Sequence, residues 1–258
     1  LCTRVSCSTI EDWEKLKRLL QYLNRTLDDY LTLGADNMTT MDTWVDASYA
    51  VHADMKSHTG GAISLGRGAA MSKSSKQKLN TKSSTEAEVV GASDYVPNSI
   101  WAAHFLEHQG YTLRRNVFHQ DNQSAMKMER NGRSSCGQKS RHIDIRYFFI
   151  KDRVDSGEID IVHCPTEMMV ADFFTKPLQG ALFKKLKSVI MGEIDVKTFQ
   201  AMSSGPKERV GKGTSEETFE VPIGPCGQTK NRQTTEPTTT RGATWRASNA
   251  DAAKMRSE

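Results

Sequence analysis

Four acidic residues stand in four different local sequence contexts, and together they could hold divalent cations. They occur in the order Asp, Glu, Asp, Asp: Asp46 in WVDAS, Glu88 in SSTEAEVV, Asp121 in FHQDNQSA and Asp172 in VADFFTKP. Carboxylates are natural protein ligands of Mg²⁺, because this ion takes oxygen ligands and keeps several waters. In-line cleavage of a phosphodiester uses two such ions about 4 Å apart, one to activate water and one to stabilise the leaving oxygen. If the four acids converge, their order suggests a two-metal phosphodiester hydrolase.

The composition is that of one globular domain with appendages. The chain has 258 residues, of which 37% are hydrophobic and 26% charged, which allows one domain of ordinary size. It contains no run of about 18 apolar residues, and its first residues, LCTRVSCSTIEDW, lack the features of a secretory signal. The five cysteines lack CxxC spacing, so neither a zinc site nor a disulfide framework is supported. We expect an intracellular protein without membrane insertion, and the start at Leu1 suggests a fragment of a longer polyprotein.

Three regions follow one another along the chain. Residues 1–41 carry an SxxE capping-box pattern at Ser8 and Glu11 and then apolar residues at helical spacing, which predicts one amphipathic helix and a linker. The apolar stripe of this helix needs a partner, either in the following domain or upstream. Residues 42–192 alternate strand and helix signals. Residues 193–258 are rich in Thr, Ser, Gly, Pro and charge, and cannot bury enough surface to offset chain entropy, so we expect disorder there.

The middle region must position the four acids. Strand signals cover 43–46, 59–65, 69–73, 117–120 and 157–164, with a turn at Gly66-Arg67-Gly68. Helix signals cover 85–105, 123–129, 143–154, 167–174 and 182–190, and Pro97 should kink or split the first of these helices. This pattern predicts an α/β fold, with a mixed sheet flanked by helices.

Each acid also has an ordinary structural interpretation. Asp46 could be a turn residue at the end of a strand, Asp121 could cap the next helix, and Glu88 could close a capping box with Thr85. Asp172 stands among apolar residues, where an unpaired carboxylate is costly unless it faces a cleft or an ion. Only the appearance of all four acids in this order, within a βββαβα pattern, favours a shared metal site.

Positive charge is concentrated between residues 113 and 153. This stretch holds ten basic residues against four acidic ones, whereas the whole chain has a net charge of only +4. Such a local excess suits binding to a phosphate backbone. A solvated basic helix face would give the same count, so charge alone leaves both interpretations open.

The stretch from residue 44 to residue 186 resembles the ribonuclease H domain at the end of the polymerase polyprotein of copia-type LTR retrotransposons. The matching motifs are SSTEAE at 83–88, HQDNQSA at 119–125, SRHIDIRYFFI at 140–150 and PTEMMVADFFTKPL at 165–178. The first region is similar to the segment that links the reverse transcriptase to that domain. The resemblance covers nearly all of residues 1–192 and none of the tail.

This resemblance implies a ribonuclease H-like fold, with a five-stranded mixed sheet whose first three strands are antiparallel. It also implies hydrolysis of the RNA strand of RNA/DNA hybrids during reverse transcription. The acidic quartet of the family would fall on Asp46, Glu88, Asp121 and Asp172. Asp46 would bridge two Mg²⁺ ions, with Mn²⁺ as the alternative metal, Glu88 and Asp121 would complete the first ion, and Asp172 the second. Glu88 is preferred to Glu86 because the family's glutamate directly precedes the apolar helix.

The resemblance further implies contacts with nucleic acid beside the acids. Candidates for contacts to 2′-hydroxyls are Asn122, Gln123 and Ser124, and candidates for contacts to phosphate are Arg141 and His142, although His142 could equally be structural. Cellular ribonucleases H carry a mobile histidine between the last core strand and the last acid, and CPTEMM has none there. His163, which ends the preceding strand, is a weak candidate to replace it.

The implied partners are an RNA/DNA hybrid and the upstream reverse transcriptase of the same polyprotein, and the implied location is a cytoplasmic virus-like particle, with a nuclear stage left open. Two alternatives remain. A decayed retroelement fragment would keep the fold and nucleic-acid binding without turnover, and the intact acids argue against it. An integrase-like strand transferase on the same fold would use Asp, Asp and a late Glu, whereas here Glu comes second.

Overall fold

The computed structural model describes residues 1–36, 38–131 and 141–203. Of residues 2, 3 and 141–144 it describes the backbone alone. The predicted tail from residue 204 onward lies outside the described residues. Among the helices described, none is both long enough and apolar enough to cross a membrane.

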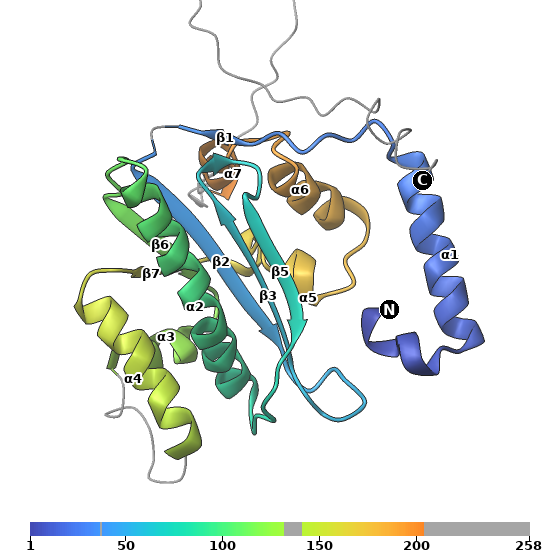
Figure 1. Cartoon of the computed structure of the whole chain (residues 1–258), viewed down its shortest axis with the longest axis horizontal. Coiled ribbons are helices and arrows are strands. Elements are labelled where there is room, and N and C mark those ends of the chain that lie inside the picture. Colours follow the sequence, from blue (N-terminus) through green and yellow to red (C-terminus); the bar gives the residue numbers. More distant parts are fainter. Residues whose placement is uncertain (37, 132–140, 204–258) are drawn as a thin grey trace, which may run out of the picture. The chain divides into compact units, whose positions relative to one another are not determined.

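A five-stranded mixed sheet forms the centre of the fold (Figure 1), in the order β5-β3-β2-β6-β7. The strands are β2 (Thr40–Ser48), β3 (His58–Ser64), β5 (Met71–Lys76), β6 (Arg115–Gln120) and β7 (Asp160–His163). The first three are antiparallel neighbours, whereas β6 runs parallel to β2 and β7 parallel to β6. This topology confirms the predicted mixed sheet, and the fold is ribonuclease H-like.

A two-stranded sheet stands apart from the central one. Strand β1 (Gly34–Ala35) pairs antiparallel with β4 (Gly66–Arg67). The segment Gly66-Arg67-Gly68, which we predicted to be a turn, therefore contains a short strand. Its two glycines have φ values of 131° and 70°, a region that favours glycine.

Helices cover both faces of the central sheet (Figure 1). One group consists of α2 (Ser84–His108), α3 (Gln123–Asn131) and α4 (Arg141–Asp155), and the other of α5 (Asp172–Thr175), α6 (Gly180–Ile190) and α7 (Val196–Ser203). Successive side chains of a strand point to opposite faces. Val45 of β2 accordingly packs in the core with α2 to α4, and Trp44 packs in the core with α5 to α7.

Three predicted elements differ from those observed. Pro97 does not split α2, which is one continuous helix. The helix predicted for 167–174 is instead a 3₁₀ helix, Thr166–Met168, followed by the four-residue α5. Helix α7 lies in residues assigned to the tail, and its Val196 and Phe199 are buried. The boundary predicted at residue 192 is therefore too early, because the folded part extends to at least Ser203.

The predicted N-terminal helix is present as α1 (Ile10–Arg25), but its cap lies one residue later than predicted. Thr9 and Asp12 form the capping box, in place of Ser8 and Glu11. Most of its apolar stripe is uncovered, and Trp13 is 57% exposed. A ring contact joins Tyr22 of α1 to Phe183 of α6, with centroids 6.2 Å apart.

Two adjacent glycines in β3 let helices approach the sheet closely from both faces. A Cβ atom on Gly60 would lie 2.7 Å from Cβ of Phe174 and from Cγ2 of Thr175, both in α5. A Cβ atom on Gly61 would lie 2.5 Å from the ring of Tyr95, in α2. Gly60 is also the register partner of Asp46 on β2. The missing side chain at Gly60 therefore allows α5 to lie directly beside Asp46.

Candidate metal centre

The register of two parallel strands brings Asp46 and Asp121 to the same end of the sheet. Trp44 of β2 pairs with His119 of β6, and each aspartate follows two residues later. Asp46 lies near the end of β2 and is 2% exposed, whereas Asp121 directly follows β6 and is half-buried. The two carboxylates reach the site because their strands are adjacent and run in the same direction.

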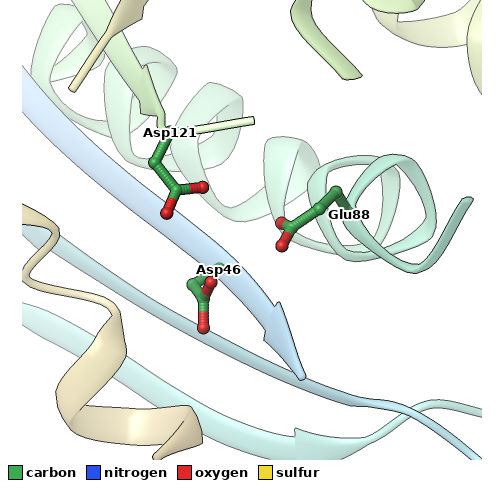
Figure 2. Close-up of side chains that lie close together, drawn as sticks. All are labelled: Asp46, Glu88 and Asp121. Atoms are coloured by element: carbon green, nitrogen blue, oxygen red, sulfur yellow. The ribbon is translucent and has the colours of Figure 1, made fainter. Parts of the chain in front are cut away.

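Glu88 reaches the same point from the start of α2. Ser83 caps this helix by accepting the N–H of Glu86 at 3.2 Å, and the Glu86 carboxylate accepts the N–H of Lys82 at 2.7 Å. Ser83 therefore caps the helix, Glu86 holds the residue before the cap, and the alternative capping box of Thr85 and Glu88 is not formed. The Glu88 carboxylate points toward the two aspartates (Figure 2), and the residue is 5% exposed.

Asp121 is likewise not used as a helix cap. Oδ1 of Asn122 accepts the N–H groups of Ser124 and Ala125, at 3.0 and 3.1 Å, and so caps α3. The buried side chain of Gln120 holds the preceding turn, because its Oε1 accepts the N–H groups of Asp121 and Asn122 at 3.0 and 3.2 Å. The turn thus fixes the backbone of Asp121 and leaves its carboxylate to face the site.

Three of the predicted acids form one cluster (Figure 2). One carboxylate oxygen from each of Asp46, Glu88 and Asp121 lies within 4.8 Å of the other two. Within the described part of the chain, the buried Oε2 of Glu88 has no hydrogen-bond partner. An unpaired buried oxygen is costly, and a cation would satisfy it. The donor set therefore fits an oxygen-preferring divalent ion such as Mg²⁺ or Mn²⁺.

The fourth acid, Asp172, joins this cluster through a lysine. Asp172 is the first residue of α5 and is 3% exposed. Nζ of Lys176 lies 2.6 Å from Oδ1 of Asp172 and 3.6 Å from Oδ1 of Asp46. The hydroxyl of Thr175 donates a hydrogen bond to Oδ2 of Asp46. Helix α5 thus supplies one acid and one hydroxyl to the site, and its C-cap residue supplies one cation.

Burial and mutual repulsion raise the pKa values of three carboxyls. Burial, followed by the charges of Asp46 and Asp121, raises the pKa of Glu88 well above its ordinary value. Burial and the charge of Asp46 raise the pKa of Asp121, and burial raises the pKa of Asp172 to about 6 although Lys176 acts in the opposite direction. The ionised cluster is therefore short of positive charge, which a bound divalent cation would supply.

The predicted nucleic-acid contacts have different surroundings. Gln123 and Ser124 are exposed in the first turn of α3, whereas Asn122 is engaged as its cap. Arg141 and His142 begin α4, but their side chains lie outside the described residues.

Other side chains near the acids were not identified from the sequence. Lys176 follows Asp172 by four residues, a spacing that pairs acids with lysines on helices, so a signal for it was present. The bond from Thr175 to Asp46 joins residues 129 positions apart, and no local pattern indicates it. Glu129 of α3 is fully buried, burial raises its pKa to about 8, and its charge acts on Glu88.

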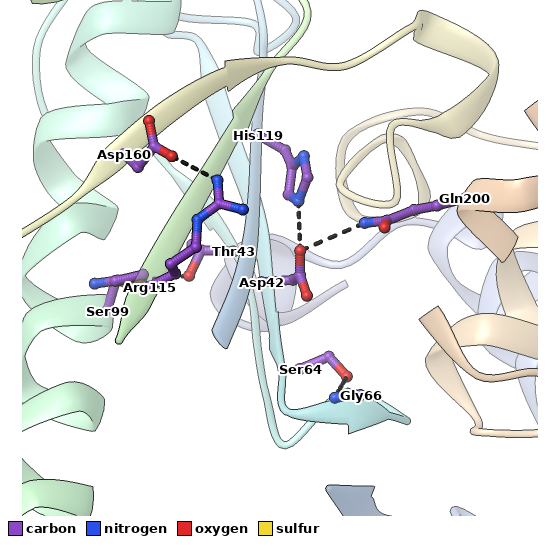
Figure 3. Close-up of polar contacts among 10 residues, drawn as sticks. Asp42, Thr43, Ser64, Gly66, Ser99, Arg115, His119, Asp160 and Gln200 are labelled. Carbon is purple, nitrogen blue, oxygen red and sulfur yellow. Dashed lines mark hydrogen bonds and ion pairs between the residues drawn. The ribbon is translucent and has the colours of Figure 1, made fainter. Parts of the chain in front are cut away.

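A second polar group lies further back on the same strands (Figure 3). Nε2 of His119 and Oδ1 of Asp42 are 2.8 Å apart, and Nε2 of Gln200 donates to the same oxygen at 3.4 Å. The His119 ring stacks on Trp44 with centroids 4.9 Å apart. These residues line a cavity of about 430 Å³ between the sheet and α7, and none of the four acids lines it.

Comparisons with known proteins identify relatives by sequence. No family model matches the chain. It is 32% identical to the retrovirus-related Pol polyprotein from transposon TNT 1-94 of Nicotiana tabacum over 181 residues. These residues are 70% of this chain and 13% of the polyprotein. It is 33% identical to the retrovirus-related Pol polyprotein from transposon RE1 of Arabidopsis thaliana over 184 residues, and these are 70% of this chain and 12% of that polyprotein. The chain thus spans about an eighth of the length of these curated relatives.

Solved structures similar to the chain include ribonucleases H. LC11-RNase H1, isolated from compost, is 12% identical, with a TM-score of 0.39 over 57% of this chain and 99% of that protein. The N-terminal RNase H domain of rv2228c from Mycobacterium tuberculosis is 11% identical, with a TM-score of 0.34 over 57% of this chain and 97% of that one. On its strand topology and its sequence relatives, the chain is a ribonuclease H-like domain homologous to a segment of the retrovirus-related Pol polyproteins of plant transposons.

Proposed function

We propose that this domain is a two-metal endonuclease that hydrolyses the RNA strand of RNA/DNA hybrids during the reverse transcription of a retrotransposon. The observation that carries this proposal is the convergence of Asp46, Glu88 and Asp121 within 4.8 Å in a ribonuclease H-like fold. The homology to Pol polyproteins of transposons supports the biological setting. The order Asp, Glu, Asp, Asp favours hydrolysis over strand transfer.

Four carboxylates would hold the metal. Asp46, Glu88 and Asp121 would hold one divalent ion, and Asp46 with Asp172 would hold the other, with Mg²⁺ or Mn²⁺ as the metal. When bound, the ions supply a water activated for attack and positive charge at the leaving oxygen.

The rest of the site keeps these ligands in place. The hydroxyl of Thr175 orients Asp46, and the side chain of Gln120 fixes the turn that carries Asp121. Glu88 is held by α2, a continuous helix that packs along β2. Such preorganisation matters because small misplacements of catalytic groups cost large factors in rate.

The hybrid would lie across the exposed start of α3. Gln123 and Ser124 follow Asp121 closely and are exposed, so they are the better-placed candidates for contacts to the 2′-hydroxyls that distinguish RNA from DNA. Contacts of Arg141 and His142 with phosphate remain part of the proposal. So do the upstream reverse transcriptase as partner and a location in virus-like particles.

The test is cleavage of a hybrid labelled on its RNA strand, with the whole chain and Mg²⁺. We expect cutting of the RNA strand only, lost in Asp46→Asn and Asp121→Asn, with a DNA duplex as the substrate control. Asp28→Asn is the matched variant, because Asp28 is exposed and outside the site. A folded wild-type protein that binds the hybrid without cutting it would instead support the decayed-element alternative.

A further inference from the structure

The ammonium of Lys176 occupies the space between two of the proposed ligands. It lies 2.6 Å from Asp172 and 3.6 Å from Asp46, the two acids that would share the second cation. The side chains of both acids are almost fully buried, at 4% and 3% exposure, whereas that of Lys176 is 38% exposed. The lysine therefore reaches the buried carboxylates from the solvent side.

The first cation position has no such occupant. Within the described residues, the ion pairs of Lys176 reach Asp172 and the shared Asp46 but not Glu88 or Asp121, and Oε2 of Glu88 lacks a hydrogen bond. At Asp121 the charge of Lys176 acts only from a greater distance, where it partly offsets the rise in the pKa of the carboxyl that burial causes. One half of the site is therefore open to a cation, while the other half already contains a positive charge.

Lys176 can leave this position without disturbing the helix that precedes it. Helix α5 ends at Thr175, and Lys176 is its C-cap, with an extended backbone at φ −120° and ψ 142°. Pro177 follows, and a residue before proline is confined to such extended conformations. The backbone N–H of Lys176 donates to the carbonyl of Asp172 at 2.9 Å. The backbone is thus held in place, while the long side chain can swing outward.

We propose that Lys176 is a displaceable counter-ion that makes the two cation positions unequal, an inference that rests on the metal-dependent function proposed above. With no cation between them, Lys176 supplies the positive charge between Asp46 and Asp172. A cation enters between these two acids only when Lys176 swings out. The position formed by Asp46, Glu88 and Asp121 therefore fills first and the Asp172 position second. Lys176 acts as a positioning residue for the second cation.

The test is titration of the whole chain with MnCl₂, followed by the electron paramagnetic resonance signal of free Mn²⁺. For the wild type we expect one ion to bind more tightly and a second to bind at least about tenfold more weakly. In Lys176→Met and Lys176→Gln, the affinity for the second ion should rise about tenfold or more. An opposite charge this close shifts the equilibrium of a carboxylate by one to three powers of ten, and a competing cation faces the same factor.

Two variants separate displacement from a general effect of charge. Lys184→Met removes the same charge from an exposed position of α6 and should leave both affinities unchanged. Lys176→Arg keeps the charge and should keep the second ion weak. Thermal unfolding of each variant verifies that it is folded, and Lys176→Gln retains a hydrogen-bond donor near Asp172 if Lys176→Met destabilises the site.

Three outcomes would overturn the inference. One is unchanged affinity for the second ion in both Met and Gln variants, and another is an equal rise in Lys176→Arg. With either result, continued cleavage of the hybrid would leave the proposed function standing. The third, absence of any Mn²⁺ binding to the wild type, would remove the metal centre itself and with it both proposals.

Discussion

Two polar groups are built around strands β2 and β6, and they differ in whether their buried polar atoms have hydrogen-bond partners. In the rear group, His119 and Gln200 both hydrogen-bond to Oδ1 of Asp42 (Figure 3), and His119 stacks on Trp44. In the front group, three carboxylates converge, and a buried oxygen of Glu88 has no partner within the described residues (Figure 2). Folding normally pairs buried polar groups. Other buried oxygens in the described part of the chain, such as Oε1 of Gln77, are also unpaired, so it is the convergence of the Glu88 oxygen with two further carboxylates that indicates a ligand at the front group.

The sharpest test of this comparison exchanges one acid in each group for its amide. Glu88→Gln should reduce cleavage of the hybrid at least about a hundredfold, because even groups behind a metal ligand cost 10- to 100-fold. The same change should raise the free energy of unfolding without divalent cations by about 1 kcal/mol, since it removes repulsion. Asp42→Asn should have little effect on cleavage and should lower the free energy of unfolding by about 1 kcal/mol, because it weakens the hydrogen bonds to Asp42. Cleavage rates measure the effect on activity, and urea unfolding measures the effect on stability. Equal losses of stability in the two variants would show that the front and rear groups do not differ in this respect.

Glu129 extends the comparison to a buried acid outside both groups. Its pKa in the folded state is about 8, against 4.5 ordinarily, so the folded protein holds a proton that the unfolded chain releases. The contribution of Glu129 to the free energy of unfolding is fully present below pH 4.5. It is lost as the pH rises to 8, by up to about 4 kcal/mol. Glu129→Gln should abolish this part of the pH dependence, as seen in urea unfolding at pH 5 and pH 8. Parallel pH profiles for variant and wild type would show that Glu129 is not protonated.

The paired glycines of β3 test how far the front group depends on the approach of α5. Gly60→Ala and Gly61→Ala should each cost about 1–3 kcal/mol of stability, because the added methyl meets atoms closer than 3 Å. Only Gly60→Ala displaces α5, which carries Asp172 and Thr175, so it should also reduce cleavage more than Gly61→Ala. Rates measured under conditions in which both variants are folded separate the two effects. Equal rates would show that the position of α5 does not limit the reaction.

Thr175 provides the smallest expected effect. Thr175→Val keeps the shape of the side chain but removes the hydrogen bond to Asp46, worth about 1 kcal/mol, so cleavage should fall severalfold to about tenfold. Thr175→Ser retains a hydroxyl and should restore most of the rate. If Thr175→Ser is as slow as Thr175→Val, the hydroxyl alone does not account for the effect, and the methyl group also contributes.

Local signals predicted the elements better than their ends. The helices at 123–129, 143–154 and 182–190 are present, because their apolar periodicity extends over several turns. The caps were misplaced where Ser, Thr and acids cluster: CSTIED and SSTEAE each offer several registers, and packing of the helix selects one of them. Helix α5 ends at Thr175 because Lys176 precedes Pro177 and has an extended backbone. It lies against Gly60, a contact that no periodicity in 167–174 indicates.

The sequence by itself determined which residue types are available and the order of strands and helices that carries them. The pairing of β2 with β6, which belongs to the tertiary structure, placed Asp46 and Asp121 each two residues beyond a register pair. Only the tertiary structure decided that Ser83 and Glu86 cap α2 and leave Glu88 to face the cluster, and that Lys176 lies between Asp46 and Asp172. The physical reason is that sequence patterns report contacts within a few residues, whereas the site is made by contacts such as that of Thr175 with Asp46, 129 positions apart.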